Sequence, residues 1–173
     1  GDTIIVESPT FIGAIAAFKS LRAELEWVPL EEDGLSVAET EKTLKRLLKE
    51  NRPPKFIYVI PNFQNPAGLT MSQDKRKALL RLALEYAVPI LEDDPYGELF
   101  FEGVREDYSP IKALPGAEKA VVLVNTFSKI LSPGMRLGWI TGDTEMIGPA
   151  EIAKQSVDAC SNSYTQVVAA DYL

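Results

Sequence analysis

The feature that most constrains the fold of this chain is a repeated alternation between apolar, β-prone runs and segments with helical periodicity. Five such alternations occur along the 173 residues. Strands that alternate with helices pair in parallel, because each helix carries the chain back to the start of the next strand. The sequence therefore predicts an α/β fold of three layers, in which a mostly parallel sheet has helices on both faces.

The boundaries of the expected elements follow from apolar spacing and from turn and capping residues. The expected strands are Thr3–Glu7, Glu24–Leu30, Phe56–Ile60, Pro89–Leu91, Lys119–Val124 and Arg136–Thr141. The expected helices are Gly13–Ala23, Ser36–Glu50, Ser72–Tyr86, Thr144–Ala159 and Thr165–Leu173. Ser36 and Glu39 have the spacing of a capping box, and Ser72 is the expected N-cap of its helix. Gly148-Pro149 is expected to break the fourth helix, and Leu99–Pro115 to form an irregular surface segment.

Composition excludes several classes of function. The net charge of −7 argues against a general nucleic-acid-binding surface. The chain has no histidine, so histidine is unavailable for metal ligation or acid–base chemistry. The single cysteine, Cys160, rules out an intramolecular disulfide and fits a reducing compartment. No apolar run approaches the length of a membrane span and no signal-peptide pattern opens the chain, so we expect a cytoplasmic protein.

Three polar segments each follow an apolar run and carry the residues of chemical interest. They are Pro61–Gly68, Leu91–Tyr96 and Asn125–Lys129. In an open α/β sheet the carboxyl ends of the strands form the ligand-binding edge, so these segments are expected to meet there. Lys129, at the end of a buried strand, is expected to lose hydration, which favours the free amine that attacks a carbonyl to form a Schiff base. Arg136, with nearby hydroxyls, would suit a phosphate.

Other interpretations of the same residues remain open on local grounds. Asn65-Pro66 followed by Gly68 is also what a plain turn requires, and the Asn65-Pro66 bond is a candidate cis peptide. Turn chemistry accounts for Asn62 and Gln64. The acidic run Glu92–Asp94 could bind a metal or lie on the surface, but no further cluster completes a metal shell. A nucleotide-binding α/β domain is disfavoured, because no glycine-rich phosphate fingerprint follows any strand.

The three segments taken together resemble the motifs of the class I/II aminotransferases, which are pyridoxal-phosphate (PLP) enzymes of fold type I. The motifs are Asn65-Pro66-Ala67-Gly68, then Asp93-Asp94-Pro95-Tyr96, then Thr126-Phe127-Ser128-Lys129 with the tail Pro133-Gly134-Met135-Arg136-Leu137-Gly138. The resemblance covers essentially the whole chain. It implies transamination between an amino acid and a 2-oxo acid, with Lys129 forming the Schiff base and moving the proton.

The resemblance also implies how the cofactor is held. Asp93 would pair with the pyridine nitrogen, so that the ring can accept electrons. Tyr96 and Asn65 would donate hydrogen bonds to the phenolic oxygen. Phe11 would stack on the pyridine ring, although a core aromatic is the alternative. The phosphate would be held by Thr126, Ser128 and Arg136.

The same resemblance sets expectations for the protein as a whole. Residues 1–173 would be a partial PLP-binding large domain whose last strand, Leu137–Thr141, runs antiparallel. The glycine-rich phosphate turn would lie before Gly1 and the arginine that clamps the substrate carboxylate after Leu173, so this chain alone is expected to be inactive. The full-length protein would be a homodimer, without membrane contact and without nucleic-acid binding through this domain.

Substrate and reaction type depend on family analogy. The sequence from Asn62 to Pro66 resembles the branch of 2-aminoadipate, aromatic and kynurenine aminotransferases. One alternative is the PLP-binding effector domain of an aminotransferase-like bacterial transcription regulator, which an upstream helix-turn-helix region would reveal. Another is a PLP-dependent β-lyase, which would release ammonia.

Overall fold

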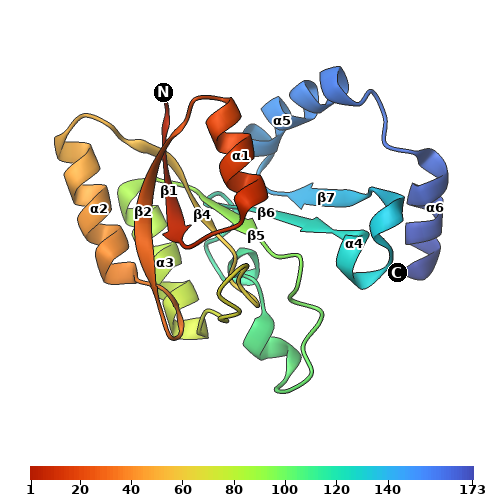
Figure 1. The fold of residues 1–173 in the computed structure, drawn as a ribbon, viewed down its shortest axis with the longest axis horizontal. Coiled ribbons are helices and arrows are strands. Elements are labelled where there is room, and N and C mark those ends of the chain that lie inside the picture. Colours follow the sequence, from red (N-terminus) through yellow and green to blue (C-terminus); the bar gives the residue numbers. More distant parts are fainter.

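A seven-stranded sheet in the order β3-β2-β1-β4-β5-β6-β7 forms the middle layer of the molecule (Figure 1). The computed structural model describes all residues from 1 to 173. Its strands are β1 (Thr3–Ser8), β2 (Glu24–Glu31), β3 (Gly34–Leu35), β4 (Pro54–Val59), β5 (Ile90–Asp93), β6 (Val121–Thr126) and β7 (Gly138–Thr141). All six predicted strands are present, with boundaries shifted by no more than two residues.

Parallel pairing dominates the sheet. β2, β1, β4, β5 and β6 pair in parallel in this spatial order, and β7 runs antiparallel to β6. The predicted α/β class and the antiparallel last strand are therefore confirmed. The short β3, which also runs antiparallel, was not predicted. It follows a tight turn that ends at Gly34, where φ is +110° and a Cβ would lie 2.8 Å from the side chain of Met71, so only glycine fits there.

Helices cover both faces of the sheet (Figure 1). The helices are α1 (Ile12–Ser20), α2 (Val37–Lys49), α3 (Gln73–Tyr86), α4 (Phe127–Ile130), α5 (Thr144–Val157) and α6 (Ser163–Tyr172). Three 3₁₀ turns lie at Arg105–Tyr108, Ile111–Ala113 and Pro133–Met135. Helices α2 and α3 pack on one face and α1 on the other. Helix α6 lies beside α4, where the Tyr172 hydroxyl donates to the Ile130 carbonyl.

The predicted helix starts are confirmed by their capping contacts. The Ser36 side chain accepts from the Glu39 amide, and the Ser72 side chain accepts from the Lys75 amide. The predicted break at Gly148-Pro149 is wrong, because α5 runs through Pro149 without interruption. Pro149 lies in the second turn of the helix, and the carbonyl that loses its partner there can bond to water because α5 has no buried residue.

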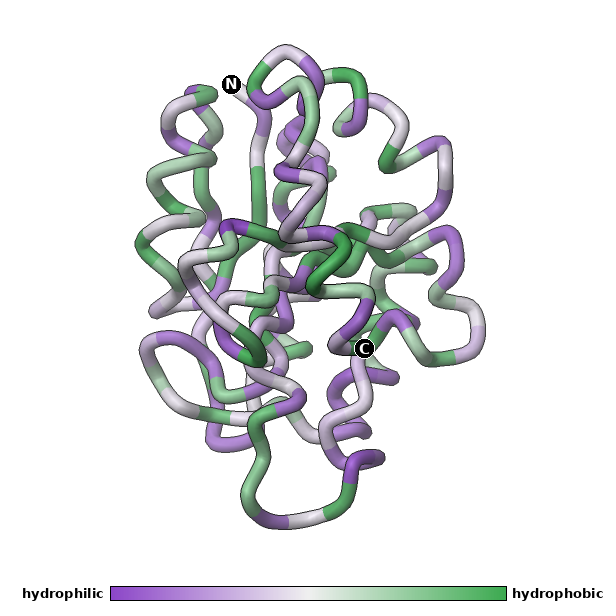
Figure 2. Tube along the Cα trace, turned by 90° about the vertical axis from the view of Figure 1, so that its right-hand side faces the viewer, coloured by the Kyte–Doolittle hydropathy of each residue, from purple (hydrophilic) through white to green (hydrophobic).

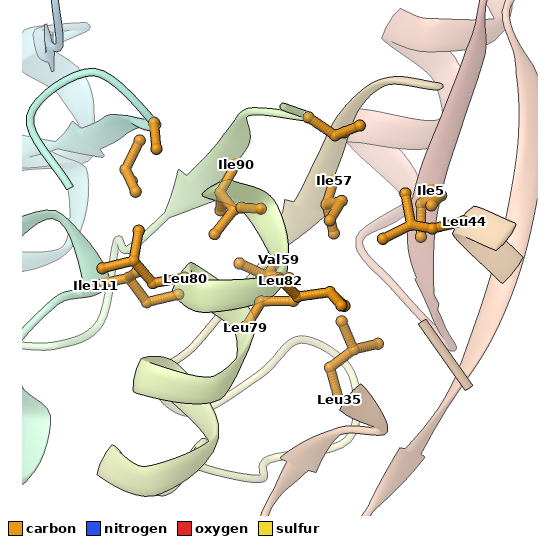
Figure 3. Packing of buried hydrophobic residues seen from close by; sticks show 14 of the residues in the cluster. Ile5, Leu35, Leu44, Ile57, Val59, Leu79, Leu80, Leu82, Ile90 and Ile111 are labelled. Carbon is orange, nitrogen blue, oxygen red and sulfur yellow. The ribbon is translucent and has the colours of Figure 1, made fainter. Parts of the chain in front are cut away.

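The hydrophobic core is divided unequally between the two faces of the sheet. On the α2 and α3 side, 18 buried residues form one cluster, part of which is shown in Figure 3. On the α1 side, the buried cluster contains only Ile4, Val6, Tyr58 and Ile60. The alternation follows from strand geometry, in which successive side chains point to opposite faces: Ile5 and Ile57 face the larger cluster, and their neighbours face the smaller one.

Hydropathy changes repeatedly along the chain, as Figure 2 shows. This is expected when successive side chains of a strand point to opposite faces of the sheet and each helix has one apolar side. No helix of the structure combines the length and apolar character needed to cross a bilayer.

Candidate active site

The candidate site lies where the chain changes direction across the sheet. From β1 the chain moves to β2 on one side, and it then returns to β4 on the other side. The connections that leave the carboxyl ends of the neighbouring strands β1 and β4 therefore run in opposite directions, to β2 and to β5. Open α/β sheets bind ligands at such a point. Phe11 follows β1 and Asn65 follows β4, while Asp93 and Thr126 end β5 and β6. All the strands concerned are parallel, so their carboxyl ends lie at the same edge.

Asp93 is held by a tyrosine that the sequence analysis did not single out. The Tyr58 hydroxyl, on the neighbouring strand β4, donates to Asp93 Oδ2 at 2.6 Å. Burial raises the pKa of Asp93, and the hydrogen bond from Tyr58 opposes that rise. Burial also raises the pKa of Tyr58, as does the adjacent Asp93 carboxylate, so the phenol stays a proton donor. The result is a half-buried carboxylate with one oxygen fixed in place.

Lys129 lies in α4, directly after β6, and approaches the tyrosine that follows β5. Its Nζ is 6.0 Å from the centroid of the Tyr96 ring. The expectation that Lys129 loses hydration is wrong for this structure, since the residue is exposed to solvent. Helix α4 has only four residues, and its N-cap is Thr126. A single short turn cannot surround the lysine stem with other side chains.

The predicted phosphate-side residues are only partly brought together. Thr126 Oγ1 lies 3.0 Å from Ser128 Oγ and accepts from the Ser128 amide at 3.1 Å. Arg136 has a left-handed backbone with φ of +50°, and its Nη1 donates to the Pro133 carbonyl at 3.2 Å. The two hydroxyls thus form one cluster at the end of β6, whereas the guanidinium is exposed and bonded to its own loop.

Phe11 and Asn65 lie in the connections that leave the carboxyl ends of β1 and β4. Phe11 is 38% exposed, so the interpretation as a core aromatic is wrong. Its ring lies over Gly13, where a Cβ would come within 2.5 Å of the ring carbons. The Asn65-Pro66 peptide is cis, as the sequence analysis anticipated. Asn65 is half-buried, and its side-chain amide makes no hydrogen bond within the chain.

Turn chemistry does not explain Asn62, and it explains Gln64 only in part, since Gln64 Oε1 accepts from the Ala67 amide at 2.8 Å within the turn. Asn62 is fully buried, and its Nδ2 donates to Asp94 Oδ1 at 2.9 Å and to the Tyr108 carbonyl at 3.0 Å. Gln64 is also buried, and its Nε2 donates to Glu7 Oε2 at 2.9 Å. Both amides connect segments far apart in the sequence. Spacing alone could not reveal this, because a polar residue after a strand is usually solvated.

The acidic residues beside Asp93 are structural. Glu92 accepts from the amides of Ile111 and Lys112 at 2.6 and 2.8 Å, and so fixes the segment before β6. Burial raises the pKa of Glu92 to about 7 and, more strongly, that of Glu7 to about 8. No group of three or more acidic or cysteine side chains is placed to hold a metal ion.

A wide cavity near the β6–β7 end of the sheet does not include the predicted site residues. It measures about 1010 Å³ and is lined by residues of the β6–β7 end and of the chain terminus, among them Asn125, Phe127, Ile130, Trp139 and Tyr172. Asp93, Tyr96 and Lys129 do not line it.

The fold is an α/β architecture with the candidate site at the carboxyl edge of its parallel strands, and comparison with known proteins gives its family. The chain belongs to the aminotransferases of class I and II, whose family description matches residues 1–173. It is 48% identical over 173 residues to aromatic-amino-acid aminotransferase 1 of Thermococcus litoralis, covering 100% of this chain and 41% of that protein. The chain therefore spans about two fifths of the length of that relative.

Two further relatives bear on function. The kynurenine aminotransferase of Pyrococcus horikoshii, solved in complex with PMP, matches with a TM-score of 0.92 and 47% identity, over 98% of this chain and 41% of that one. An uncharacterized HTH-type transcriptional regulator of Bacillus subtilis, YisV, is 32% identical over 173 residues, which is 98% of this chain and 34% of that protein.

Proposed function

We propose that this chain is the cofactor-binding part of a PLP-dependent aminotransferase that exchanges an amino group between an amino acid and a 2-oxo acid. The observation that carries the proposal is the meeting of a carboxylate, a phenol and a lysine at one sheet edge, from Asp93, Tyr96 and Lys129. Membership of the family and the PMP complex of the Pyrococcus horikoshii relative support it.

The residues present match the chemistry of pyridoxal phosphate. Its pyridine nitrogen needs a carboxylate, and Asp93 is held in place by Tyr58. Its phenolic oxygen needs donors, and the Asn65 amide and Tyr96 hydroxyl make no hydrogen bonds within the chain, so both are free to donate. Its phosphate needs hydroxyls and a cation, which the Thr126–Ser128 cluster and Arg136 can supply.

Pyridoxal phosphate, when bound, supplies a carbonyl carbon for an amine and a ring that accepts electrons. Lys129 would provide the amine that holds it as a Schiff base, and would later move the proton at the substrate's α-carbon. Asp93 would keep the ring nitrogen protonated, because a carboxylate beside a cation stabilises the charged form. Phe11 offers an exposed ring for stacking, and its place after β1 suits one face of the cofactor.

The substrate class is proposed from relatives. The matching proteins include an aromatic-amino-acid aminotransferase, a 2-aminoadipate transaminase and a kynurenine aminotransferase. We therefore expect a dicarboxylic or aromatic amino acid as amino donor. A homodimeric holoenzyme and a cytoplasmic location belong to the same proposal, supported by the family resemblance and by the single cysteine, Cys160.

A second candidate function is regulation of transcription through a bound cofactor. It is favoured by one observation, the 32% identity to an HTH-type regulator over this same stretch. A helix-turn-helix region upstream in the full protein would support it. Such a protein would bind the cofactor through Lys129 and yet release no 2-oxo acid.

The test is a visible absorption spectrum of the full-length protein with PLP, comparing wild type with Lys129→Ala and with Lys119→Ala as control. Lys119 is an exposed lysine at the far end of β6. The wild type and Lys119→Ala should show a pH-sensitive band that bleaches with glutamate or aminoadipate, and Lys129→Ala should not. A band that ignores every amino acid would favour the regulator. A band of wild-type strength in Lys129→Ala would refute the assignment of Lys129.

The same experiment tests the chain by itself. We expect residues 1–173 alone to show no turnover above that of free PLP, because substrate-clamping residues are expected elsewhere in the protein. Measurable transamination by this chain would contradict that expectation. Borohydride trapping followed by peptide mapping would show whether Lys129 captures the cofactor in either form.

A further inference from the structure

A fully buried arginine lies behind the candidate site and has no part in the chemistry proposed above. Arg76, in the first turn of α3, has no exposed surface and is the largest of the fully buried side chains. Burying a guanidinium is costly unless its donors are satisfied. Burial lowers the pKa of Arg76, while the charges of Glu92 and Asp94 oppose the shift. A cation retained at such a position calls for an explanation.

The donors of Arg76 reach three separate segments of the chain. Nε donates to the Met71 carbonyl at 2.9 Å, and Nη1 donates to the Ser109 carbonyl at 2.9 Å. Nη2 donates to the Pro61 carbonyl at 3.2 Å and to Asn62 Oδ1 at 2.7 Å. The acceptors are neutral oxygens, so Arg76 acts here as a planar hydrogen-bonding template and not as half of an ion pair.

Asn62 extends the contact of Arg76 to the strand that carries Asp93. With its oxygen bonded to Arg76, Asn62 presents its Nδ2 to Asp94 Oδ1 at 2.9 Å. The same Asp94 oxygen accepts from the Gly97 amide at 3.1 Å. A Cβ at Gly97 would come within 2.5 Å of the Asp94 carboxylate, so that turn is tightly closed. The turn therefore has little freedom to move away from Asn62.

Two of the proposed cofactor donors are attached to the two ends of this network. Asn65 lies three residues after Asn62, in the turn that Arg76 holds through Pro61 and Asn62. Tyr96 lies inside the turn closed between Asp94 and Gly97. Both side chains are proposed to donate to one atom, the phenolic oxygen, so their separation must be set within a few tenths of an ångström.

We propose that Arg76 is a positioning residue that sets the separation between Asn65 and Tyr96 by clamping their two turns together through Asn62. The proposal rests on the function proposed above. The relay runs Arg76–Asn62–Asp94. A lysine could not replace Arg76, since a single ammonium cannot reach four acceptors arranged around a plane.

The test uses the full-length protein loaded with PLP and measures the pH midpoint of the visible absorption band. Donors to the phenolic oxygen draw charge from it and weaken its hold on the neighbouring proton, which lowers the midpoint. Arg76→Met should therefore raise the midpoint by about one pH unit, and Asn62→Ala should raise it in the same direction. Arg76→Lys should recover only a small part of the wild-type value.

Two controls separate positioning from loss of stability. Arg81→Met removes an exposed arginine from the same helix and should leave the midpoint unchanged. Leu79→Ala removes a buried core side chain of α3 that has no donor or acceptor for the Arg76–Asn62–Asp94 network; it should lower the melting temperature and leave the midpoint of the folded fraction unchanged. A merely structural role predicts that Arg76→Met behaves like Leu79→Ala, and that result would overturn the proposal.

The remaining outcomes are also decisive. If Arg76→Met does not fold, Asn62→Ala and Arg76→Lys report on the same relay, and wild-type midpoints in both would refute it. If the wild-type protein shows no band at all, the proposed function fails first, and Arg76 then has no cofactor donors to position. The two failures are therefore distinguishable by the wild-type spectrum alone.

Discussion

Residues 1–126 and residues 127–173 both contribute to the candidate site, but they are packed very differently. The first region contains the 18-residue cluster between the sheet and helices α2 and α3. In the second region only Phe127 and Ala169 are buried. All four residues of β7 are exposed, and α5 buries none of its 14 residues.

The difference divides the site between a well-supported part and a poorly supported part. Asp93 ends β5 and Tyr96 follows it; β5 has sheet neighbours on both sides, and Tyr58 fixes the Asp93 carboxylate. Lys129 and Arg136 lie on short, exposed turns. Pre-organised groups lose less entropy on binding. The side of the site proposed for the pyridine ring is therefore preformed within this chain, whereas the side proposed for the phosphate has few contacts to hold it.

The largest expected effect is a pH dependence that belongs only to the packed region. Burial raises the pKa of Glu7 from 4.5 to about 8, and that of Glu92 from 4.5 to about 7. The folded state then binds protons more tightly than the unfolded state, so stability is fully present below pH 4.5 and is lost as pH rises toward 8. We expect a loss on the order of a few kcal/mol in the free energy of unfolding between pH 5 and 8.

Urea denaturation at several pH values measures this loss. Glu7→Gln keeps an acceptor and a donor without an ionisable proton, so it should flatten the dependence. Glu85→Gln, at an exposed position of α3, serves as the control and should leave the slope unchanged. Stability that rises between pH 5 and 8 would contradict the assignment of buried, protonated carboxyls.

A smaller effect compares one apolar side chain from each region. Leu79 is fully buried in the larger cluster, whereas Ile152 in α5 is 71% exposed. Leu79→Ala should lower the free energy of unfolding by about 3 kcal/mol, through lost burial and the cavity left behind. Ile152→Ala should change it by less than about 0.5 kcal/mol. Denaturant midpoints of the two variants measure these changes. Equal losses in the free energy of unfolding would show that α5 packs as tightly as α3.

The smallest effect compares two tyrosine hydroxyls. Tyr58 donates to Asp93 at 2.6 Å, whereas Tyr172, 55% exposed, donates to the Ile130 carbonyl at 3.2 Å. Tyr58→Phe should cost about 1–2 kcal/mol, because it leaves a half-buried carboxylate without its donor. It should also raise the pKa of Asp93, since the hydrogen bond from Tyr58 lowers it.

Tyr172→Phe is the matched control, and a cost below about 0.5 kcal/mol is expected for it. Thermal denaturation gives both values, and titration of Asp93 by NMR gives the pKa. An unchanged Asp93 pKa in Tyr58→Phe would mean that Tyr58 does not hold the carboxylate. The side of the site proposed for the pyridine ring would then not be preformed.

Local sequence determined most of the fold. Apolar, β-prone runs predicted the strands, and Ser36 and Ser72 marked the helix starts that their capping contacts confirm. The motif residues were found at strand ends because the chemistry of each residue type and its spacing are local properties. The unbroken α5 and the two-residue β3 were missed, since the first depends on solvent reaching a freed carbonyl and the second on a close contact with Met71.

Only the tertiary structure decided which polar residues are buried. Arg76, Asn62, Gln64 and Glu7 look like ordinary surface residues in the sequence, yet all four are buried and hydrogen-bonded across more than ten residues of sequence. The exposure of Lys129 was equally invisible to local reasoning. Burial depends on which distant segments meet around a side chain. The sequence by itself therefore determined the elements and the chemical groups, and tertiary packing decided how firmly each group is held.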